Sequence, residues 1–408
     1  MEMKITDVEV TILSFAPEKP IADALNLNLA WGDTIVQLHT DEGLTGIGEA
    51  CAPFASPLLV KAIVEKSFRQ YLVGEEPFHR ERIWEKMYLS SLRYGRKGVA
   101  ISAISGVDIA IWDLIGKATN MPIYKLLGGY RDEVRAYASA GFYQESKGIQ
   151  DLAEEMAQFP KRGFTAVKIK IGRDPAEDVE RVRAVREAIG DKVDLIVDAN
   201  AVWNPRTAIK FANRIEKHNI LWFEEPVSAD DLEGLATVTS KIDIPTSTGE
   251  QEYTRYGFRD LITKRAVDIV QPDVVTAGGI SEAYKIAALA SAHHLLCVPH
   301  TFTSPISLAA NLHLIASIPN GFIVEFDTTE MTPLRDKLLR VPFQIDHRGF
   351  VKVPDGPGLG IELDEKTVAT YREDLSIEQW KEAGRSLRIP TRAMWQAPPA
   401  DGEIAGIP

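Results

Sequence analysis

Hydrophobic and polar residues change their spacing along this chain, and each change predicts a different kind of structure. Near the start, apolar positions alternate with polar ones, as in antiparallel strands, over residues 5–12, 35–39 and 44–48. From about 57 to 117 the apolar positions recur every three or four residues, which predicts helices. From residue 134 onward, short apolar runs alternate with helical stripes, which predicts parallel strands joined by helices.

One unit shows this repeat clearly. Residues 166–171 alternate like a strand, and Gly172 ends it. Asp174 suits the N-cap of the following helix and Pro175 its first position, while Gly190 ends the helical stripe. Further strands are predicted at 193–197, 221–223, 244–247, 267–270, 295–298 and 322–324. This many repeats favours an α/β fold with a closed TIM-type barrel over an open sheet.

Side chains that can bind a metal or move a proton stand at or just after the ends of the predicted strands. Successive members are 23 to 28 residues apart, close to the about 30 residues that a barrel uses for one strand and helix. Catalytic residues of such barrels lie at the C-terminal ends of several strands, so the spacing predicts one common site. Its members are Lys170, Asp198, Glu224, Glu250, Asp273, His300 and Glu325.

Asp198, Glu224 and Glu250 are carboxylates on three consecutive strand ends. Three carboxylates leave about three positions of an octahedron open for water and substrate oxygens, which suits Mg²⁺, with Mn²⁺ as the alternative. A single carboxylate in such a place is more often a surface or helix-capping group. Three carboxylates at the same interval, however, favour a metal site. Glu225 points the other way in a strand and is predicted to support the ligands from behind.

Two lysines share one predicted strand. Lys168 and Lys170 are two residues apart and so lie on one face, whereas Val167, Ile169 and Ile171 occupy the other. The apolar face must pack against the helices, so both lysines are predicted to point into the barrel. Two neighbouring ammonium groups near a metal lower each other's pKa, which would make Lys170 a base near neutral pH.

Asp273 and His300 end neighbouring strands and are predicted to pair. A carboxylate that accepts a hydrogen bond from one imidazole nitrogen orients the ring and makes the other nitrogen more basic. Glu325 would face the site from the last strand, and Asn200, on the face of Asp198, could donate to a substrate carboxylate. This set predicts removal of a proton next to a carboxylate, with the metal stabilising the enediolate that forms.

The residues around these positions resemble the enolase superfamily, and within it the mandelate racemase subgroup. The motifs that carry the resemblance cover nearly the whole chain: SGVDIAIWD (105–113), VKIKIG (167–172), VDAN (197–200), FEEP (223–226), TGE (248–250), QPD (271–273), VPH (298–300), VEFD (324–327) and VPDGPGLGIELD (353–364). The resemblance implies a modified (β/α)₇β barrel covered by an α+β cap built from both ends of the chain. We expect an N-terminal cap region at 1–130, the barrel at 131–328, and a C-terminal segment at 329–408 that returns to the cap and ends in an extended tail.

The resemblance also implies a role for each site residue. It places the Mg²⁺ ligands at Asp198, Glu224 and Glu250, one general base at Lys170, the second base or acid at His300 with Asp273, support of the substrate carboxylate at Lys168, and the electrophilic acid at Glu325. The muconate-lactonizing and dipeptide-epimerase subgroups carry a lysine on the sixth strand, where this chain has Asp273. The mandelate racemase subgroup is therefore favoured.

Members of that subgroup share the first chemical step and differ in the second. We predict an acid-sugar dehydratase, a lyase that eliminates water from a sugar acid to give a 2-keto-3-deoxy acid. The alternatives are a racemase or epimerase of a 2-hydroxy acid, a cycloisomerase of an aldaric-acid lactone, and a metal-binding homologue without turnover. In the family, specificity comes from two cap loops, which here would be about 16–32 and 51–57.

Composition adds limits on the partners. A net charge of −12 argues against non-specific nucleic-acid binding, although a bound cation can still attract an anionic substrate. Cys51 and Cys297 are too few for a disulfide framework, and the sequence has neither a signal pattern nor an apolar run of about 18 residues. We therefore expect a cytoplasmic homo-oligomer, from dimer to octamer, that acts on a small carboxylate and binds neither nucleic acid nor membrane.

Overall fold

The structure is a computed structural model, and the two predicted cap loops lie only partly within the residues it describes. The predicted tail beyond residue 389 lies wholly outside them. The described residues are 3–15, 17, 19–28, 32–51, 57–302, 304–329 and 333–373.

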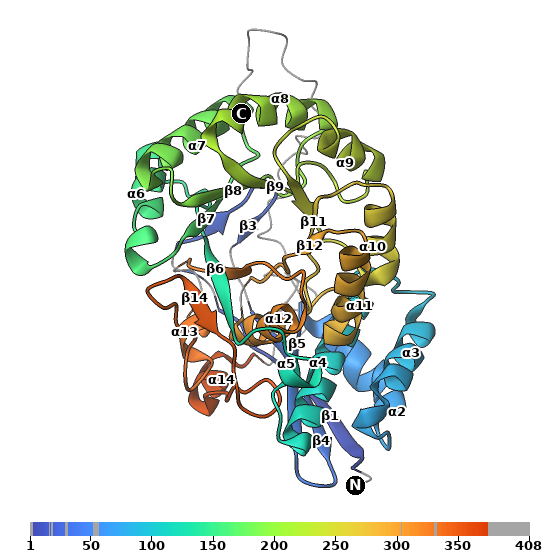
Figure 1. Ribbon diagram of the computed structural model, residues 1–408. Coiled ribbons are helices and arrows are strands. Elements are labelled where there is room, and N and C mark those ends of the chain that lie inside the picture. Colours follow the sequence, from blue (N-terminus) through green and yellow to red (C-terminus); the bar gives the residue numbers. More distant parts are fainter. Residues whose placement is uncertain are drawn as a thin grey trace.

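Eight parallel strands of the described chain form a curled sheet ringed by helices (Figure 1). Their spatial order is β12-β11-β10-β9-β8-β7-β6-β13. The strands are β6 (Glu133–Ser139), β7 (Ala166–Lys170), β8 (Asp194–Asp198), β9 (Ile220–Glu224), β10 (Thr246–Thr248), β11 (Ile269–Val270), β12 (Leu296–Cys297) and β13 (Val324–Asp327). A parallel bridge between Cys297 and Gly321 joins β12 to the segment before β13, which brings the two edges of the sheet together.

Each of the first seven strands of this ring is followed by a helix of the outer layer. The helices are α6 (Ile149–Met156), α7 (Pro175–Ile189), α8 (Pro205–Ile215), α9 (Leu232–Thr239), α10 (Thr254–Thr263), α11 (Gly279–Ala292) and α12 (Pro305–Ser317). The order is (β/α)₇β, so the fold prediction is confirmed. The predicted start of α7 is also confirmed, because the Asp174 carboxylate accepts hydrogen bonds from the amides of Ala176 and Glu177 at 2.8 and 3.2 Å.

The alternation of the strands separates an apolar floor from a polar layer inside the barrel. Outward residues such as Val167 and Ile169 pack in the large core under the helices. The inward floor consists of Tyr137, Ala166, Ile196, Trp222, Ile269, Val298 and Ile323. Two residues beyond each of these stands a polar one, in the same order: Ser139, Lys168, Asp198, Glu224, Gln271, His300 and Glu325. Because side chains two apart share a face, the polar layer lies above the floor, toward the carboxyl ends of the strands.

A smaller α+β part precedes the barrel. Its antiparallel sheet has the order β1 (Ile5–Ile12), β4 (Thr34–Thr40), β5 (Thr45–Ala50), beside the short hairpin of β2 (Ile21–Ala22) and β3 (Leu27–Asn28). Its helices are α1 (Pro57–Ala62), α2 (Arg69–Leu72), α3 (Arg80–Ser91), α4 (Val99–Thr119) and α5 (Ile123–Leu126). Helix α4 lies so close to β5 that a Cβ atom at Gly48 would be 2.1 Å from the carbonyl oxygen of Gly106.

Helix α4 is also the only described helix that is long and apolar enough to cross a membrane. Nearly all of it is buried inside the protein, between β5, α3 and α11. Asp108 and Asp113 lie in its middle and contact other segments, since Asp108 accepts from the amide of Ser281 and Asp113 from the amide of Ile47. These features are those of a core helix.

The C-terminal segment runs back across the barrel to the cap. Strand β14 (Phe350–Lys352) pairs antiparallel with β6, and the helices α13 (Leu334–Lys337) and α14 (Glu365–Tyr371) flank it (Figure 1). The amide of Leu359 donates to Asp113 of α4 at 2.8 Å. Main-chain hydrogen bonds then join Tyr371 to Ser14 and Glu373 to Ile12. The cap is therefore built from both ends of the chain, as the resemblance implies.

Contacts between cap and barrel gather at the carboxyl ends of the strands. The amide of Cys51 donates to the carbonyl of Val275 at 2.9 Å, just beyond β11. Ala22 of the hairpin and Tyr143, just beyond β6, exchange two main-chain hydrogen bonds of 2.9 and 2.8 Å. The cap therefore covers the end of the barrel where the polar layer lies.

Candidate active site

The seven side chains predicted to share a site do lie together. A continuous set of ion pairs links the two lysines, Asp198, Glu224 and Glu325, and another links His300 with Asp273, Glu250 and Glu325. Residues up to 155 positions apart in the sequence thus meet at one end of the barrel, because each lies at or beyond the end of a different parallel strand.

Asp198, Glu224 and Glu250, here called the acidic triad, each offer an oxygen within 4.8 Å of the others. Burial raises the pKa of Glu224 to about 7 and also raises that of Glu250. In addition, Oε2 of Glu250 is buried and accepts no hydrogen bond, although Nε2 of His300 lies 3.3 Å away. Clustered, buried carboxylates fit a divalent cation, whose charge would offset their burial. The triad can therefore hold a metal ion.

Lys168 lies beneath the triad and is completely buried. Its Nζ is 2.6 Å from Oε1 of Glu224, 2.7 Å from Oε1 of Glu325 and 3.6 Å from Oδ2 of Asp198. Burial by itself lowers the pKa of Lys168, but the carboxylates of Glu224 and Glu325 outweigh it and raise the pKa well above its ordinary value. Lys168 is therefore a fixed positive charge, and its contact with a substrate carboxylate stays a prediction.

The protonation of Lys170 depends on a neighbouring carboxylate. Its Nζ lies 2.5 Å from Oδ2 of Asp198. Burial lowers the pKa of Lys170, but Asp198 raises it by more than Lys168 lowers it, so the pKa is above its ordinary value. The expected lowering of the pKa assumed a metal beside the two lysines and stays a prediction; among the protein's own groups, the Asp198 carboxylate has the larger effect and raises the pKa. Arg181 fixes the end of this strand, since one of its Nη atoms donates to the carbonyls of Lys170 and Gly141 at 3.1 and 3.0 Å.

The structure contains the predicted Asp–His pair on the other side of the triad. Nδ1 of His300 is 2.7 Å from Oδ2 of Asp273. Its Nε2 points toward the triad, 3.3 Å from Oε2 of Glu250 and 3.9 Å from Oε2 of Glu325. Burial lowers the pKa of His300, but these three carboxylates together raise it to about 10. His300 is thus held in one orientation, with a proton available toward the centre of the site.

Glu325 completes the polar layer on the last strand. Besides Lys168, it accepts a hydrogen bond from the amide of Thr301 at 3.1 Å. Burial raises the pKa of Glu325, but Lys168 and His300 more than offset this and lower it to about 2. Glu325 is therefore ionised beside Lys168 and His300, whereas the electrophilic role implied by the resemblance needs the protonated form.

Asn200 and Glu225 stand just beyond two residues of the triad in left-handed backbone conformations, with φ of 45° and 44°. The amide of Asn200 donates to Oδ1 of Asp198 at 2.8 Å, while its own side-chain oxygen has no partner. Glu225 accepts from the side chain of Gln251 at 2.9 Å and is almost completely buried. The side-chain oxygen of Asn200 is thus free to accept a hydrogen bond, and its contact with a substrate carboxylate stays a prediction. Glu225 contacts Gln251, the residue next to Glu250, and its support of the metal ligands also stays a prediction.

Two residues that hold Glu224 were missed from the sequence. Nε1 of Trp222 and the side-chain amide of Gln271 both donate to Oε2 of Glu224, at 3.0 and 2.9 Å. Each stands two positions before a predicted site residue, Glu224 and Asp273, and so on the same inward face. The two-residue period that placed Lys168 on the same face as Lys170 would also have placed Trp222 and Gln271 on the inward face.

Comparison with known proteins matches nearly the whole described chain. Residues 7–128 match the mandelate racemase / muconate lactonizing enzyme N-terminal domain, and residues 151–367 match the enolase C-terminal domain-like family. The chain is 40% identical to arabinonate dehydratase of Saccharolobus solfataricus over 82% of this chain and 89% of that protein. It is 38% identical to D-galactarolactone cycloisomerase of Agrobacterium fabrum over 91% of this chain and 99% of that protein.

Solved structures agree with this match. A member of the enolase superfamily from a Polaromonas species superposes with a TM-score of 0.86 at 33% identity, covering 91% of this chain and 98% of that one. A racemase from Streptomyces coelicolor with bound magnesium superposes with a TM-score of 0.84 at 31% identity, covering 90% of this chain and all of that one. Both the cap and the barrel therefore have close structural counterparts.

Proposed function

The chain belongs to the mandelate racemase/muconate lactonizing enzyme family of the enolase superfamily, and on this basis we propose that it is an acid-sugar dehydratase. The observation that supports this most is the placement of two proton-transfer groups around the acidic triad. Lys170 lies on one side and the Asp273–His300 pair on the other. A substrate between them can lose a proton on one face and exchange a second proton on the other.

In the proposed reaction, Lys170 first gives up its extra proton, which a cation bound at Asp198 would favour by offsetting the negative charge that raises the pKa of Lys170. The neutral amine then takes the proton from the carbon next to the substrate carboxylate. The electron pair of that C–H bond moves toward the carboxylate to give an enediolate. The enediolate then expels the hydroxyl group of the next carbon, to which Nε2 of His300 gives its proton, so that water leaves. The enol that remains becomes the 2-keto-3-deoxy acid by tautomerisation. Asp273 keeps the imidazole in the required orientation throughout.

We further propose Mg²⁺ as the cofactor, with Asp198, Glu224 and Glu250 as its ligands. Mg²⁺, which is bound in the Streptomyces racemase, would supply positive charge against the negative charge that grows on the substrate carboxylate. Lys168, Trp222 and Gln271 would keep Glu224 in place for this task. Glu225 would help to hold the triad from behind.

Mg²⁺ is expected to stabilise the folded protein. A ligand that binds only the folded state adds about 2.7 kcal/mol when its concentration is about 100 times its Kd. The thermal unfolding midpoint should therefore rise with added MgCl₂ and fall to a constant value with EDTA. Glu250→Gln should weaken this dependence, since it removes one carboxylate charge. An identical response of the wild-type protein and this variant would show that the stabilising ion binds elsewhere.

Incubation in D₂O with hexonates, pentonates and aldarates tests the proposed reaction. We expect a 2-keto-3-deoxy acid from at least one of them, detected by NMR. Deuterium uptake next to the carboxylate without elimination would instead show a racemase or epimerase. The similarity to D-galactarolactone cycloisomerase supports one second candidate, and consumption of an aldaric lactone without uptake of water would identify it. A protein that changes none of these compounds would contradict the proposal.

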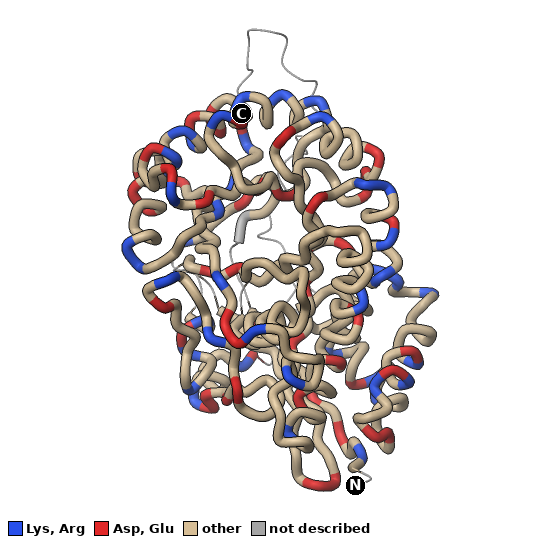
Figure 2. Tube along the Cα trace, viewed as in Figure 1, with Lys and Arg blue, Asp and Glu red and all other residues tan. Residues whose placement is uncertain are grey.

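We also propose that the domains divide near residues 130 and 328. We further propose that the protein is cytoplasmic and forms a homo-oligomer. Figure 2 shows basic and acidic residues interspersed along the outer helices of the barrel. In this view, the barrel surface therefore carries charges of both signs. Light scattering of the purified chain would give the oligomeric state directly.

A further inference from the structure

Asp273 and His300 stand on two different segments of the barrel, and the end of β5 in the cap contacts both segments. Cys51, which follows β5, makes the first contact. Its amide donates to the carbonyl of Val275 at 2.9 Å, and the amide of Val275 donates to Oδ1 of Asp273 at 3.0 Å. A single residue therefore links the cap to the carboxylate that orients His300.

Glu49, the last residue but one of β5, makes the second contact, with the helix that follows His300. Its Oε2 accepts from the amide of Ser307 in the first turn of α12 at 3.1 Å. The hydroxyl group of Ser304, the N-cap of α12, donates a second hydrogen bond to Glu49. The exposed fractions of Glu49, Ser307 and Ser304 are 2%, 0% and 3%. A helix provides no acceptor for its first amides, so without Glu49 the buried amide of Ser307 would lose its partner.

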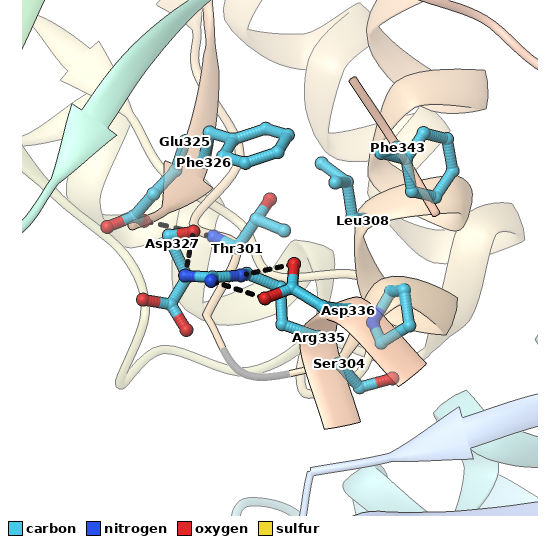
Figure 3. A pocket seen from close by; sticks show the side chains of 10 residues that line it. Thr301, Ser304, Leu308, Glu325, Phe326, Asp327, Arg335, Asp336 and Phe343 are labelled. Atoms are coloured by element: carbon cyan, nitrogen blue, oxygen red, sulfur yellow. Dashed lines mark hydrogen bonds and ion pairs between the residues drawn. The ribbon is translucent and has the colours of Figure 1, made fainter. Parts of the chain in front are cut away.

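The chain between His300 and α12 is attached at both of its ends. The amide of Thr301 donates to Oε2 of Glu325 at 3.1 Å, which attaches the near end to the barrel. Ser304 attaches the far end to the cap through Glu49. Thr301 and Ser304 both line the small hollow beside β13 (Figure 3). Because His300 directly precedes Thr301, a shift of α12 relative to the cap would be transmitted to the imidazole.

The helix that follows Asp273 is attached to the cap in a similar way. Oδ2 of Asp108 on α4 accepts from the amide of Ser281 in the first turn of α11 at 2.9 Å. The hydroxyl group of Ser105, also on α4, accepts from the amide of Gly278 at 2.8 Å. Side chains of the cap thus bind the first turns of the two helices that follow the Asp–His pair.

Lys170, on the other side of the triad, is held by groups of the barrel. Its Nζ lies 2.5 Å from Oδ2 of Asp198, and its carbonyl accepts from the guanidinium of Arg181 on α7 at 3.1 Å. Loss of the contact between the cap and α12 should therefore disturb the acid side of the site and leave the base side in place.

We propose that Glu49 is a positioning residue for His300: it ties α12 to the cap and so keeps the Asp273–His300 pair aligned for the expulsion of the hydroxyl group. This inference rests on the proposed function, in which Lys170 removes the α-proton and His300 protonates the leaving group. Glu49 acts through α12 and touches neither the substrate nor the metal.

Glutamine and methionine are the matched substitutions at this position. Burial, followed by the carboxylates of Asp33 and Asp273, raises the pKa of Glu49 well above its ordinary value, which favours the uncharged form. Glutamine is also uncharged, and its side-chain oxygen can accept from the amide of Ser307. Methionine has a similar length but offers only a weak acceptor. The two variants therefore separate the hydrogen bonds of Glu49 from its volume.

The ratio of two rates in the Mg²⁺-loaded enzyme tests the inference. For an acid that the wild-type enzyme dehydrates in D₂O, NMR follows the 2-keto-3-deoxy acid and the α-deuterium in the remaining substrate. Glu49→Met should slow elimination by about 10–100-fold with little change in exchange, since a misplacement of about 1 Å can cost about 100-fold in rate. Glu49→Gln should keep the wild-type ratio. Equal slowing of both rates in Glu49→Met would show a purely structural role and overturn the inference.

Two further variants make this result specific. Ser304→Ala is a smaller change at the same contact, and it should shift the ratio in the same direction by several-fold even if Glu49→Met does not fold. Asp113→Met is the control, because it removes another buried carboxylate of the cap, which accepts from the amides of Ile47 and Leu359. A shift in Asp113→Met as large as that in Glu49→Met would show general loosening of the cap and contradict the role of Glu49. Thermal unfolding shows which variants are folded.

A crystal structure of Glu49→Met separates the inference from the proposed function. The contact between Nδ1 of His300 and Oδ2 of Asp273, 2.7 Å in the wild-type protein, should lengthen or break. An unchanged contact would overturn the inference even if the wild-type protein is a dehydratase. If the wild-type protein dehydrates none of the acids, the proposed function fails, and the structure of the variant still decides whether Glu49 positions His300.

Discussion

Replacing Lys170 by alanine is expected to lower the turnover of the sugar acid by about 10²–10⁴-fold, the contribution typical of a general base. The same substitution should abolish deuterium uptake next to the carboxylate in D₂O. The physical reason is that Lys170 is the proposed base on its side of the triad, 2.5 Å from Asp198. Rates of elimination and of exchange, both followed by NMR, check this result.

His300→Asn should give a different pattern from Lys170→Ala. Because His300 is proposed to protonate the departing hydroxyl group, its loss should slow elimination by a similar factor while exchange of the α-proton continues. Lys264→Ala, which removes an exposed lysine on the outer surface, should change neither rate. If exchange were lost in His300→Asn and kept in Lys170→Ala, the two roles would be reversed. If neither variant lost activity, the homologue without turnover would be the better interpretation.

Replacing Lys168 by methionine is expected to destabilise the metal-free protein by about 3–5 kcal/mol, the usual effect of removing one partner from a buried ion pair. Glu224 and Glu325 would lose the ammonium that now lies 2.6 and 2.7 Å from their oxygens, in a place without solvent. Urea unfolding in EDTA measures the change in the free energy of unfolding. Lys264→Met breaks an exposed, solvent-screened pair with Glu233 and should leave the free energy of unfolding nearly unchanged.

The effect of Lys168→Met should also depend on pH. Lys168 holds the pKa of Glu325 at about 2, below the ordinary value of 4.5, so this pairing stabilises the fold above about pH 4.5 and is lost as the pH falls toward 2. The variant lacks this contribution, and at low pH its carboxylates can escape the penalty by binding protons. The difference in stability between wild-type and variant should therefore be larger at pH 8 than at pH 4. A difference independent of pH would indicate lost packing rather than lost charge.

The barrel and the membership of its site could be predicted because both depend on periods that are written along the chain. Alternation with a period of two places Lys168 and Lys170 on the inward face. The interval of one strand and one helix places the site residues Asp198, Glu224, Glu250, Asp273 and His300 around one end of the barrel. The same period could have found Trp222 and Gln271, which were overlooked. Local hydrophobic patterning carries this information because it decides which face of each strand is buried.

The charge state of the site could not be predicted in the same way. The sequence shows Lys168 next to Lys170, but only the folded protein shows that the Asp198 carboxylate lies 2.5 Å from the Lys170 ammonium. The result is a raised rather than a lowered pKa. Electrostatic effects depend on distances between strands and on the loss of water, and neither is set by spacing along the chain.

By itself, the sequence predicted a barrel with three carboxylates between a lysine pair and an Asp–His pair, since strand alternation and repeat length are local properties of the chain. Only the tertiary structure decided which charges balance one another and which oxygens remain unpaired. Ser139 and Asp327, 188 residues apart, become neighbours because the last strand pairs with the first strand of the barrel. That closure of the sheet, which no local pattern encodes, brings the last strand beside the first.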